Sequence, residues 1–291
     1  MNVAELLRQV RELEITARKN VTSALVGNYT TAIRGRGLDF HEARKYTPGD
    51  DTRQIDWNMT ARCGEAYVRV HLDEREREVF LALDVSPSMH LGWQDRTKLE
   101  YAVEMAATLA VSAVEQKDKL GYVLFADQVV DFSPPRRGQE QLFRALKAML
   151  LQVRSGPRGR GESDLRLAIH AIQRLKGRRF VVFLISDFIE RDVPEDFRYV
   201  QSRHDVSLLH VYDPVEYART RAVFFPAYAP EGRARLACVA PGCAGSLEGL
   251  HAFLKEEGEK YRMTVQSFPT RAPVAAAMRY FLHLKRRTSL R

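Results

Sequence analysis

The chain has 291 residues, of which 45% are hydrophobic and 28% are charged, and its formal net charge is +8. This length and apolar content suffice for a globular core and exclude a disordered or collagen-like chain. No window is long and uncharged enough to span a bilayer, and the N-terminus reads as a charged amphipathic helix instead of a signal peptide. Three cysteines do not make a disulfide framework, which favours the reducing cytoplasm as the compartment. We therefore expect a cytoplasmic protein, and one without a membrane span.

The first elements in chain order are a helix and a polar segment. Apolar residues recur at helical spacing over residues 3–26 and predict an amphipathic helix there. The segment that follows, up to about residue 72, is rich in turn residues, with one short strand expected at 67–71. We therefore divide the chain into residues 1–75, an N-terminal helix with a small β-rich clasp, and residues 76–291, an α/β domain.

In the second part, predicted strands and helices alternate. The expected strands are 79–84, 121–125, 129–132, 180–186, 207–212 and 264–268. The expected helices are 97–115, 138–152, 164–175, 196–203, 246–257 and 274–284. Helical crossovers between strands predict a doubly wound, mostly parallel sheet with helices on both faces. In the strand order 3-2-1-4-5, the first and fourth strands are neighbours at the switch point where ligands bind.

The most informative motif comes directly after the apolar strand at 79–84. Asp84, Ser86 and Ser88 stand at alternate positions, at the carboxyl end of a strand that is expected to be buried on both faces. A carboxylate followed by two hydroxyls suits a hard divalent cation, which prefers oxygen ligands. The alternative is an ordinary Ser-Pro turn that caps the next helix.

Two later residues extend this motif. Asp187 follows the strand at 180–186, and Ser163 comes at the start of a helix, after the turn-rich stretch SGPRGRG. If the first and fourth strands are neighbours, both residues come close to Asp84. Alternatively, Ser163 is a helix N-cap, a role that Asp164 could fill instead, and Asp187 is a solvated loop carboxylate.

The combination of Asp84, Ser86, Ser88, Ser163 and Asp187 resembles the metal-ion-dependent adhesion site of von Willebrand factor A (vWA) domains. That family has D-x-S-x-S, a distant Thr and a distant Asp, and Ser163 stands at the Thr position while keeping the hydroxyl. The resemblance implies a vWA-like fold and a bound divalent cation, Mg²⁺ first, with Mn²⁺ or Ca²⁺ as alternatives. It also implies that an Asp or Glu of a partner completes the metal coordination, so the expected function is protein binding and not enzyme catalysis.

The segment before the sheet carries a second and more specific resemblance. It reads GRGLDFHEARKYTPGDDTRQIDWNMTARC and is similar to the signature of the domain of unknown function family fifty-eight, with Asp39 where that family usually has Glu. Members are commonly encoded with MoxR-type AAA+ ATPases, which implies such an ATPase as partner, a client protein, and an adaptor role in protein assembly or maturation. The signature residues expected to form either a partner-docking surface or a salt-bridged clasp are Arg44, Tyr46, Asp50, Asp51, Arg53, Asp56, Trp57 and Arg62.

Two other classes of function stay open at this point. Paired strand-end aspartates also occur in haloacid-dehalogenase-like phosphohydrolases, but the second Asp that those phosphatases need is Ser86 here. The basic net charge suggests nucleic-acid binding, although the arginines are not interleaved with aromatic residues as in a binding module. Metal-dependent turnover of a phosphate ester would indicate the first class. Salt-dependent retention on nucleic acid that survives Asp84→Ala would indicate the second.

Overall fold

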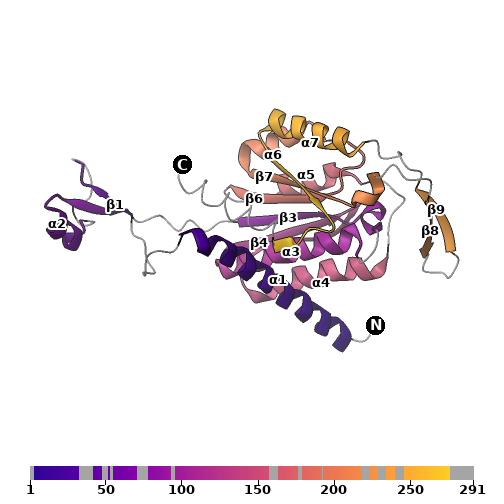
Figure 1. Ribbon diagram of the computed structural model, residues 1–291, viewed down its shortest axis with the longest axis horizontal. Coiled ribbons are helices and arrows are strands. Elements are labelled where there is room, and N and C mark those ends of the chain that lie inside the picture. The colour runs from indigo at the N-terminus through magenta and orange to yellow at the C-terminus, as the bar shows by residue number, and fades with distance from the viewer. Residues whose placement is uncertain are drawn as a thin grey trace. The chain divides into compact units, whose positions relative to one another are not determined.

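The fold was analysed in a computed structural model (Figure 1). It describes residues 3–32, 42–47, 52, 55–70, 78–92, 96–156, 163–175, 179–191, 193–217, 223–228, 234–239 and 246–275. Contacts divide the chain into two units: residues 1–28 together with 77–291, and residues 29–76. The larger unit contains the sheet that carries the candidate site.

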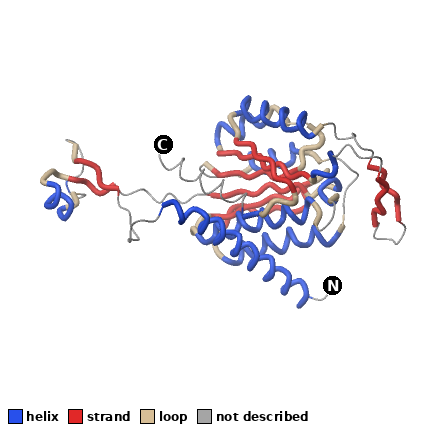
Figure 2. Tube along the Cα trace, in the orientation of Figure 1, coloured by secondary structure: helices blue, strands red, loops and turns tan. Residues whose placement is uncertain are grey.

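A six-stranded sheet forms the centre of the larger unit (Figure 2). Its strands are β3 (Glu78–Asp84), β4 (Lys119–Phe125), β5 (Val129–Arg136), β6 (Phe180–Ser186), β7 (Asp205–Tyr212) and β10 (Thr264–Pro269). Their spatial order is β10-β7-β6-β3-β4-β5, and every neighbouring pair is parallel except the antiparallel pair β4 and β5. The predicted doubly wound order is confirmed, because β3 and β6, the first and fourth strands of the sheet, are neighbours.

Helices cover both faces of this sheet (Figure 1). On one side lie α1 (Val3–Ala32), α3 (Lys98–Glu115) and α4 (Gln139–Ser155), and on the other lie α5 (Leu165–Gln173), α6 (Phe197–Arg203) and α7 (Leu247–Tyr261). Two short 3-10 helices, η2 (Pro87–His90) and η3 (Pro214–Tyr217), come directly after β3 and β7. Both therefore begin at the carboxyl edge of the sheet, where the candidate site was predicted.

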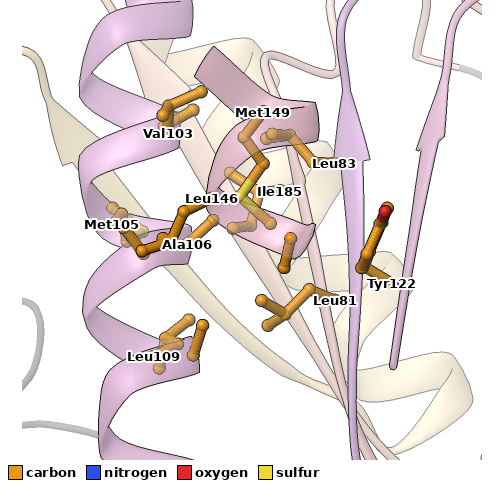
Figure 3. Packing of buried hydrophobic residues seen from close by; sticks show 14 of the residues in the cluster. Leu81, Leu83, Val103, Met105, Ala106, Leu109, Tyr122, Leu146, Met149 and Ile185 are labelled. Atoms are coloured by element: carbon orange, nitrogen blue, oxygen red, sulfur yellow. The ribbon is translucent and has the colours of Figure 1, made fainter. Parts of the chain in front are cut away.

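The pleat of each central strand divides the hydrophobic core between the two faces. In β3, Val79, Leu81 and Leu83 belong to the cluster that includes α3 and α4, whereas Phe80 and Ala82 belong to the cluster that includes α5 and α7. Figure 3 shows side chains of α3 and α4 packed against Leu81 and Leu83. Successive side chains of a strand point to opposite faces, so a strand covered on both sides is apolar throughout.

Helix α1 packs on α3 within the larger unit. Its buried apolar residues are Leu6, Val10, Ala17, Val21 and Ala24. Asn20 donates a hydrogen bond to Glu104 Oε1 at 2.8 Å, and Arg18 forms an ion pair with Glu115 at 2.6 Å. The predicted division at residue 75 placed this helix with the signature segment. The structure groups it with the sheet instead, because its apolar stripe is buried against that core.

The smaller unit combines a pair of strands with a short helix. Strand β1 (Glu42–Lys45) pairs antiparallel with β2 (Tyr67–Val70), and α2 (Trp57–Cys63) lies between them in the sequence. The helix begins at Asp56, whose side chain accepts hydrogen bonds from the backbone N–H groups of two residues, and ends at Gly64, where φ is 73°. Strand β2 matches the predicted strand, but α2 and β1 were not predicted.

Two further strands lie between η3 and α7 in the sequence. Strand β8 (Val223–Tyr228) pairs antiparallel with β9 (Ala234–Val239) to form a two-stranded sheet. The role of residues 216–245 was left open from the sequence, with a strand or a partner-facing patch as alternatives for the apolar stretch AVFFPAYAP, and β8 lies within that stretch. The last predicted helix, at 274–284, lies mostly outside the described residues, which end at Ala275.

Candidate metal-binding site

Three buried polar residues lie where the adjacent strands β3 and β6 end. Asp84 and Ser186 are the last residues of their strands, and Asp187 directly follows. By the alternation of the pleat, Asp84 and Ser186 continue the face that packs on α5, whereas Asp187 continues the face that packs on α3. Strand pairing therefore brings polar groups from both faces to the switch point of the sheet.

Asp84 is the centre of a hydrogen-bond network. Its Oδ1 accepts from the backbone N–H of Ser86 at 2.9 Å, and its Oδ2 accepts from the hydroxyls of Ser163 at 2.8 Å and Ser186 at 2.6 Å. The pKa of Asp84 is raised to about 6, first by burial and next by the negative charge of Asp187. The site therefore disfavours the ionised carboxylate, and a cation beside it would offset that penalty.

The hydroxyls of Ser86 and Ser88 lie 3.0 Å apart. Ser86 immediately precedes η2 and Ser88 lies within it, so this short helix holds both side chains on one side of a tight turn. Neighbouring ligands of an octahedral Mg²⁺ ion, each at about 2.0–2.1 Å from the metal, are about 2.9 Å from each other. The distance between the two hydroxyls thus fits two ligands of one ion.

The structure separates the two roles that were open for Ser163. Asp164 is the N-cap of α5, because its side chain accepts a hydrogen bond from the backbone N–H of Arg166 at 2.9 Å. Ser163 lies one residue earlier and donates its backbone N–H to Glu190 Oε1 at 2.7 Å. Its hydroxyl is therefore not the helix cap and instead donates to Asp84.

Asp187 faces a buried lysine. Lys98 is the first residue of α3, and its Nζ lies 2.8 Å from Asp187 Oδ2 and 2.7 Å from Glu216 Oε1, with the lysine side chain 0% exposed. Burial alone would lower the pKa of Lys98, but the charges of Asp187 and Glu216 outweigh it and hold that pKa above its ordinary value. Burial raises the pKa of Glu216, against the opposing effect of Lys98. Asp187 is thus not a solvated loop carboxylate.

The predicted ligands come together in part through direct contacts. Asp84, Ser86, Ser88 and Ser163 are joined by hydrogen bonds, and Asp187 acts on Asp84 through its charge. Within the described ranges, no three His, Cys, Asp or Glu residues are arranged to hold a metal ion. A cation at this site would therefore depend on the serine hydroxyls as well as on the carboxylates, and metal binding stays a prediction.

Ser186, Lys98 and Glu216 were not predicted from the sequence. Ser186 carried a usable signal, because strand alternation places it on the same face as Asp84 once the two strands are neighbours. Lys98 and Glu216 carried none. Their partners lie on other elements, so neither spacing nor composition marks them.

The signature residues belong to the smaller unit. Tyr46 donates its backbone N–H to Ala66 O at 2.8 Å, Asp56 caps α2, and Arg62 lies exposed in the last turn of α2. Trp57, at the start of α2, is 70% exposed. Asp50, Asp51, Arg53 and the side chain of Arg44 lie outside the described residues. Both roles considered for this segment, docking surface and salt-bridged clasp, stay predictions.

Comparison with known proteins identifies relatives over most of the chain. The model of the family described as "Protein of unknown function DUF58" matches residues 42–219. Uncharacterized protein Rv1480 of Mycobacterium tuberculosis and Uncharacterized protein Mb1516 of Mycobacterium bovis are each 32% identical over 213 residues. This alignment covers 72% of the chain and 66% of each relative, which is just under two thirds of their length.

Solved structures with a similar arrangement include BatB from Bacteroides thetaiotaomicron and a von Willebrand factor type A protein from Catenulispora acidiphila. BatB has 17% identity and a TM-score of 0.48, over 71% of this chain and 97% of BatB. The Catenulispora protein has 14% identity and a TM-score of 0.43, over 71% of this chain and 42% of that one. In the described part of the chain, no helix has both the length and the apolar character needed to cross a bilayer. The family match over residues 42–219 shows that the chain belongs to the DUF58 family.

Proposed function

We propose that this chain is a non-enzymatic, metal-dependent protein-interaction module. The observation that carries the proposal is the Ser86–Ser88 pair, with hydroxyls 3.0 Å apart beside the buried Asp84. These groups are hard oxygen donors, which favour Mg²⁺ and leave Mn²⁺ and Ca²⁺ as alternatives. The bound ion would be held by Asp84, Ser86, Ser88, Ser163 and Asp187.

The charges of this ligand set favour an anionic group as the last ligand. Asp84 and Asp187 supply negative charge, but Lys98 already pairs with Asp187. The three serine hydroxyls are neutral. A divalent ion held here would therefore keep positive charge toward solvent, and an Asp or Glu of a partner protein would neutralise it. Capture of an acidic side chain follows from this charge balance.

The partner that we propose is a MoxR-type AAA+ ATPase, with a client protein that offers the acidic side chain. The support is the resemblance of the signature segment to a family commonly encoded with such ATPases. The chain would act in the cytoplasm as an adaptor during protein assembly or maturation. Its net charge of +8 also favours acidic partner surfaces.

Calorimetric titration with Mg²⁺ and Mn²⁺ tests the metal-binding part. We expect saturable one-site binding by the unaltered chain and at least about tenfold weaker binding by Ser86→Ala, which removes one hydroxyl while keeping the backbone N–H that Asp84 accepts. Ser202→Ala on the exposed face of α6 is the matched control and should bind like the unaltered chain. Absence of binding to either ion would contradict the proposal.

Complex formation with the purified ATPase tests the partner. The comparison should use Ser86→Ala instead of a chelator, because the ATPase itself needs Mg²⁺ to bind nucleotide. We expect the unaltered chain and Ser202→Ala to co-elute with the ATPase and an acidic client, and Ser86→Ala to lose the client. Equal co-elution of the client with all three chains would show that the serine-lined site does not hold the client.

A further inference from the structure

Lys98 lies among several buried acidic residues. Its Nζ pairs with Asp187 and Glu216, and Asp84 is also buried at the same edge of the sheet. Asp213 is a further buried carboxylate near Glu216. Its side chain accepts a hydrogen bond from the backbone N–H of Val215 at the start of η3. Of these carboxylates, Asp84 and Asp187 belong to the proposed ligand set, and Lys98 offsets one of their two negative charges.

We propose that Lys98 is an internal cation that limits the negative charge of the metal site, so that a bound divalent ion keeps its attraction for an anionic partner group. This inference rests on the proposed function and assigns a charge-setting role to a residue outside the ligand set. Lys98 acts through Asp187, one of the proposed ligands. It is therefore a positioning residue of that site.

The location of Lys98 suits this role. It is the first residue of α3, only ten positions after the last serine of the motif, and its side chain is 0% exposed. Two carboxylates from separate elements hold its ammonium group, so the charge cannot move into solvent as a surface lysine would. Replacing a buried ion pair by apolar residues is often neutral or stabilising, so stability alone does not explain a buried lysine.

The proposal predicts opposite effects on two ligands. Without Lys98 the site would be more negative and would bind a divalent cation more tightly. The same change would neutralise the bound ion more completely and weaken its attraction for a carboxylate. If Lys98 had a purely structural role, its loss would weaken the binding of both the cation and the carboxylate. Tighter cation binding together with weaker carboxylate binding therefore distinguishes the charge-setting role from a structural one.

The experiment compares Lys98→Met, Glu216→Gln and the double variant with the unaltered chain by calorimetric titration with Mn²⁺. We expect at least about tenfold tighter binding by Lys98→Met and weaker binding by Glu216→Gln, because a charge a few Å away acts strongly on a divalent ion. The double variant removes one positive and one negative charge, so its affinity should return to within about threefold of the original. Lys255→Met, at a 79% exposed side chain, is the control and should leave the affinity unchanged.

A second measurement uses acetate as the anionic probe. Acetate is added to each Mn²⁺-loaded chain, and the broadening of its methyl proton signal by the paramagnetic ion reports binding. We expect acetate to bind several-fold more weakly to Lys98→Met than to the unaltered chain. Equal or stronger acetate binding by Lys98→Met would overturn the inference, as would Mn²⁺ affinity that does not rise.

The outcomes separate this inference from the proposed function. If the unaltered chain binds Mn²⁺ but Lys98→Met binds it no more tightly, the metal-dependent function stands and only the charge-setting role of Lys98 is wrong. If neither binds, both are wrong. Circular dichroism identifies any variant that fails to fold. If Lys98→Met does not fold, Glu216→Gln and the double variant decide, and the inference fails if their Mn²⁺ affinities are equal.

Discussion

The hydroxyl of Ser163 donates a hydrogen bond to Asp84 Oδ2 at 2.8 Å, although 79 positions separate the two residues in the sequence. The contact joins the end of β3 to the segment that leads into α5. It exists because Asp164 caps that helix and Ser163 does not. A hydroxyl is thereby held against a buried carboxylate, at the position where the vWA pattern has a threonine.

This relationship predicts different results for two substitutions of Ser163. Ser163→Ala removes a proposed ligand that also donates to Asp84, and should weaken Mn²⁺ binding by at least about tenfold. Ser163→Thr keeps the hydroxyl and should bind within about threefold of the unaltered chain. Calorimetric titration measures both. Equal weakening by the two substitutions would show that the hydroxyl itself is not the contributing group.

A second prediction concerns Ser186 and the free energy of unfolding. Its hydroxyl donates to Asp84 Oδ2 at 2.6 Å and accepts from the backbone N–H of Phe188 at 3.1 Å. Ser186→Ala leaves a buried carboxylate and a buried N–H each without one partner, which should cost about 1–3 kcal/mol of stability. Urea unfolding measures this change. Ser202→Ala, at an exposed position, is the control, and an equally small effect of both substitutions would contradict the prediction.

A third prediction concerns Arg96, which links the loop after η2 to the segment after β10. Its guanidinium donates to the backbone carbonyls of Thr270 at 2.7 Å and Ala272 at 2.9 Å, and it pairs with Glu104 at 3.0 Å. Arg96→Gln should increase the rate of amide hydrogen exchange over residues 269–275 by roughly tenfold. Without these hydrogen bonds, local opening of the segment costs less free energy and occurs more often. Arg166→Gln, at an exposed arginine, is the comparison. Unchanged exchange at 269–275 would show that other contacts hold this segment.

A fourth prediction concerns pH. The pKa of His210 is lowered to about 3, chiefly by burial and next by the nearby His251. At pH values below the ordinary histidine pKa of 6.5, His210 takes up a proton in the unfolded chain but not in the folded chain. The free energy of unfolding should therefore fall as the pH drops from 6.5 toward 3, by up to about 1.4 kcal/mol per pH unit for this group.

Urea unfolding at about pH 7 and about pH 5 measures this pH dependence. His210→Gln removes the titrating group and should show a smaller loss of stability between the two values. Other histidines with lowered pKa, among them His204 and His251, account for what is left of the slope. An identical loss in both chains would show that His210 does not contribute.

The central strands β3 and β6 could be predicted because each is an almost continuous apolar run that ends in polar residues. The run at 180–186 coincides with β6, and the run at 79–84 differs from β3 by one residue. The elements α2, β1 and β9 were not predicted, and the stretch that contains β8 was open between a strand and a partner-facing patch. Residues WNMTARC of α2 alternate apolar and polar residues as a strand would, although they form a helix, and the four residues of β1 are too few to show a period.

By itself, the sequence determined the order of the sheet and placed Asp84 and Asp187 at the ends of neighbouring strands, because apolar runs and helical crossovers leave few topologies. Only the tertiary structure decided which groups meet these carboxylates. Lys98 reaches Asp187 and Glu216 because α3, β6 and η3 converge at one edge of the sheet. Such ion pairs join residues far apart along the chain, and no local pattern of residue types records a contact that forms only when those elements pack together.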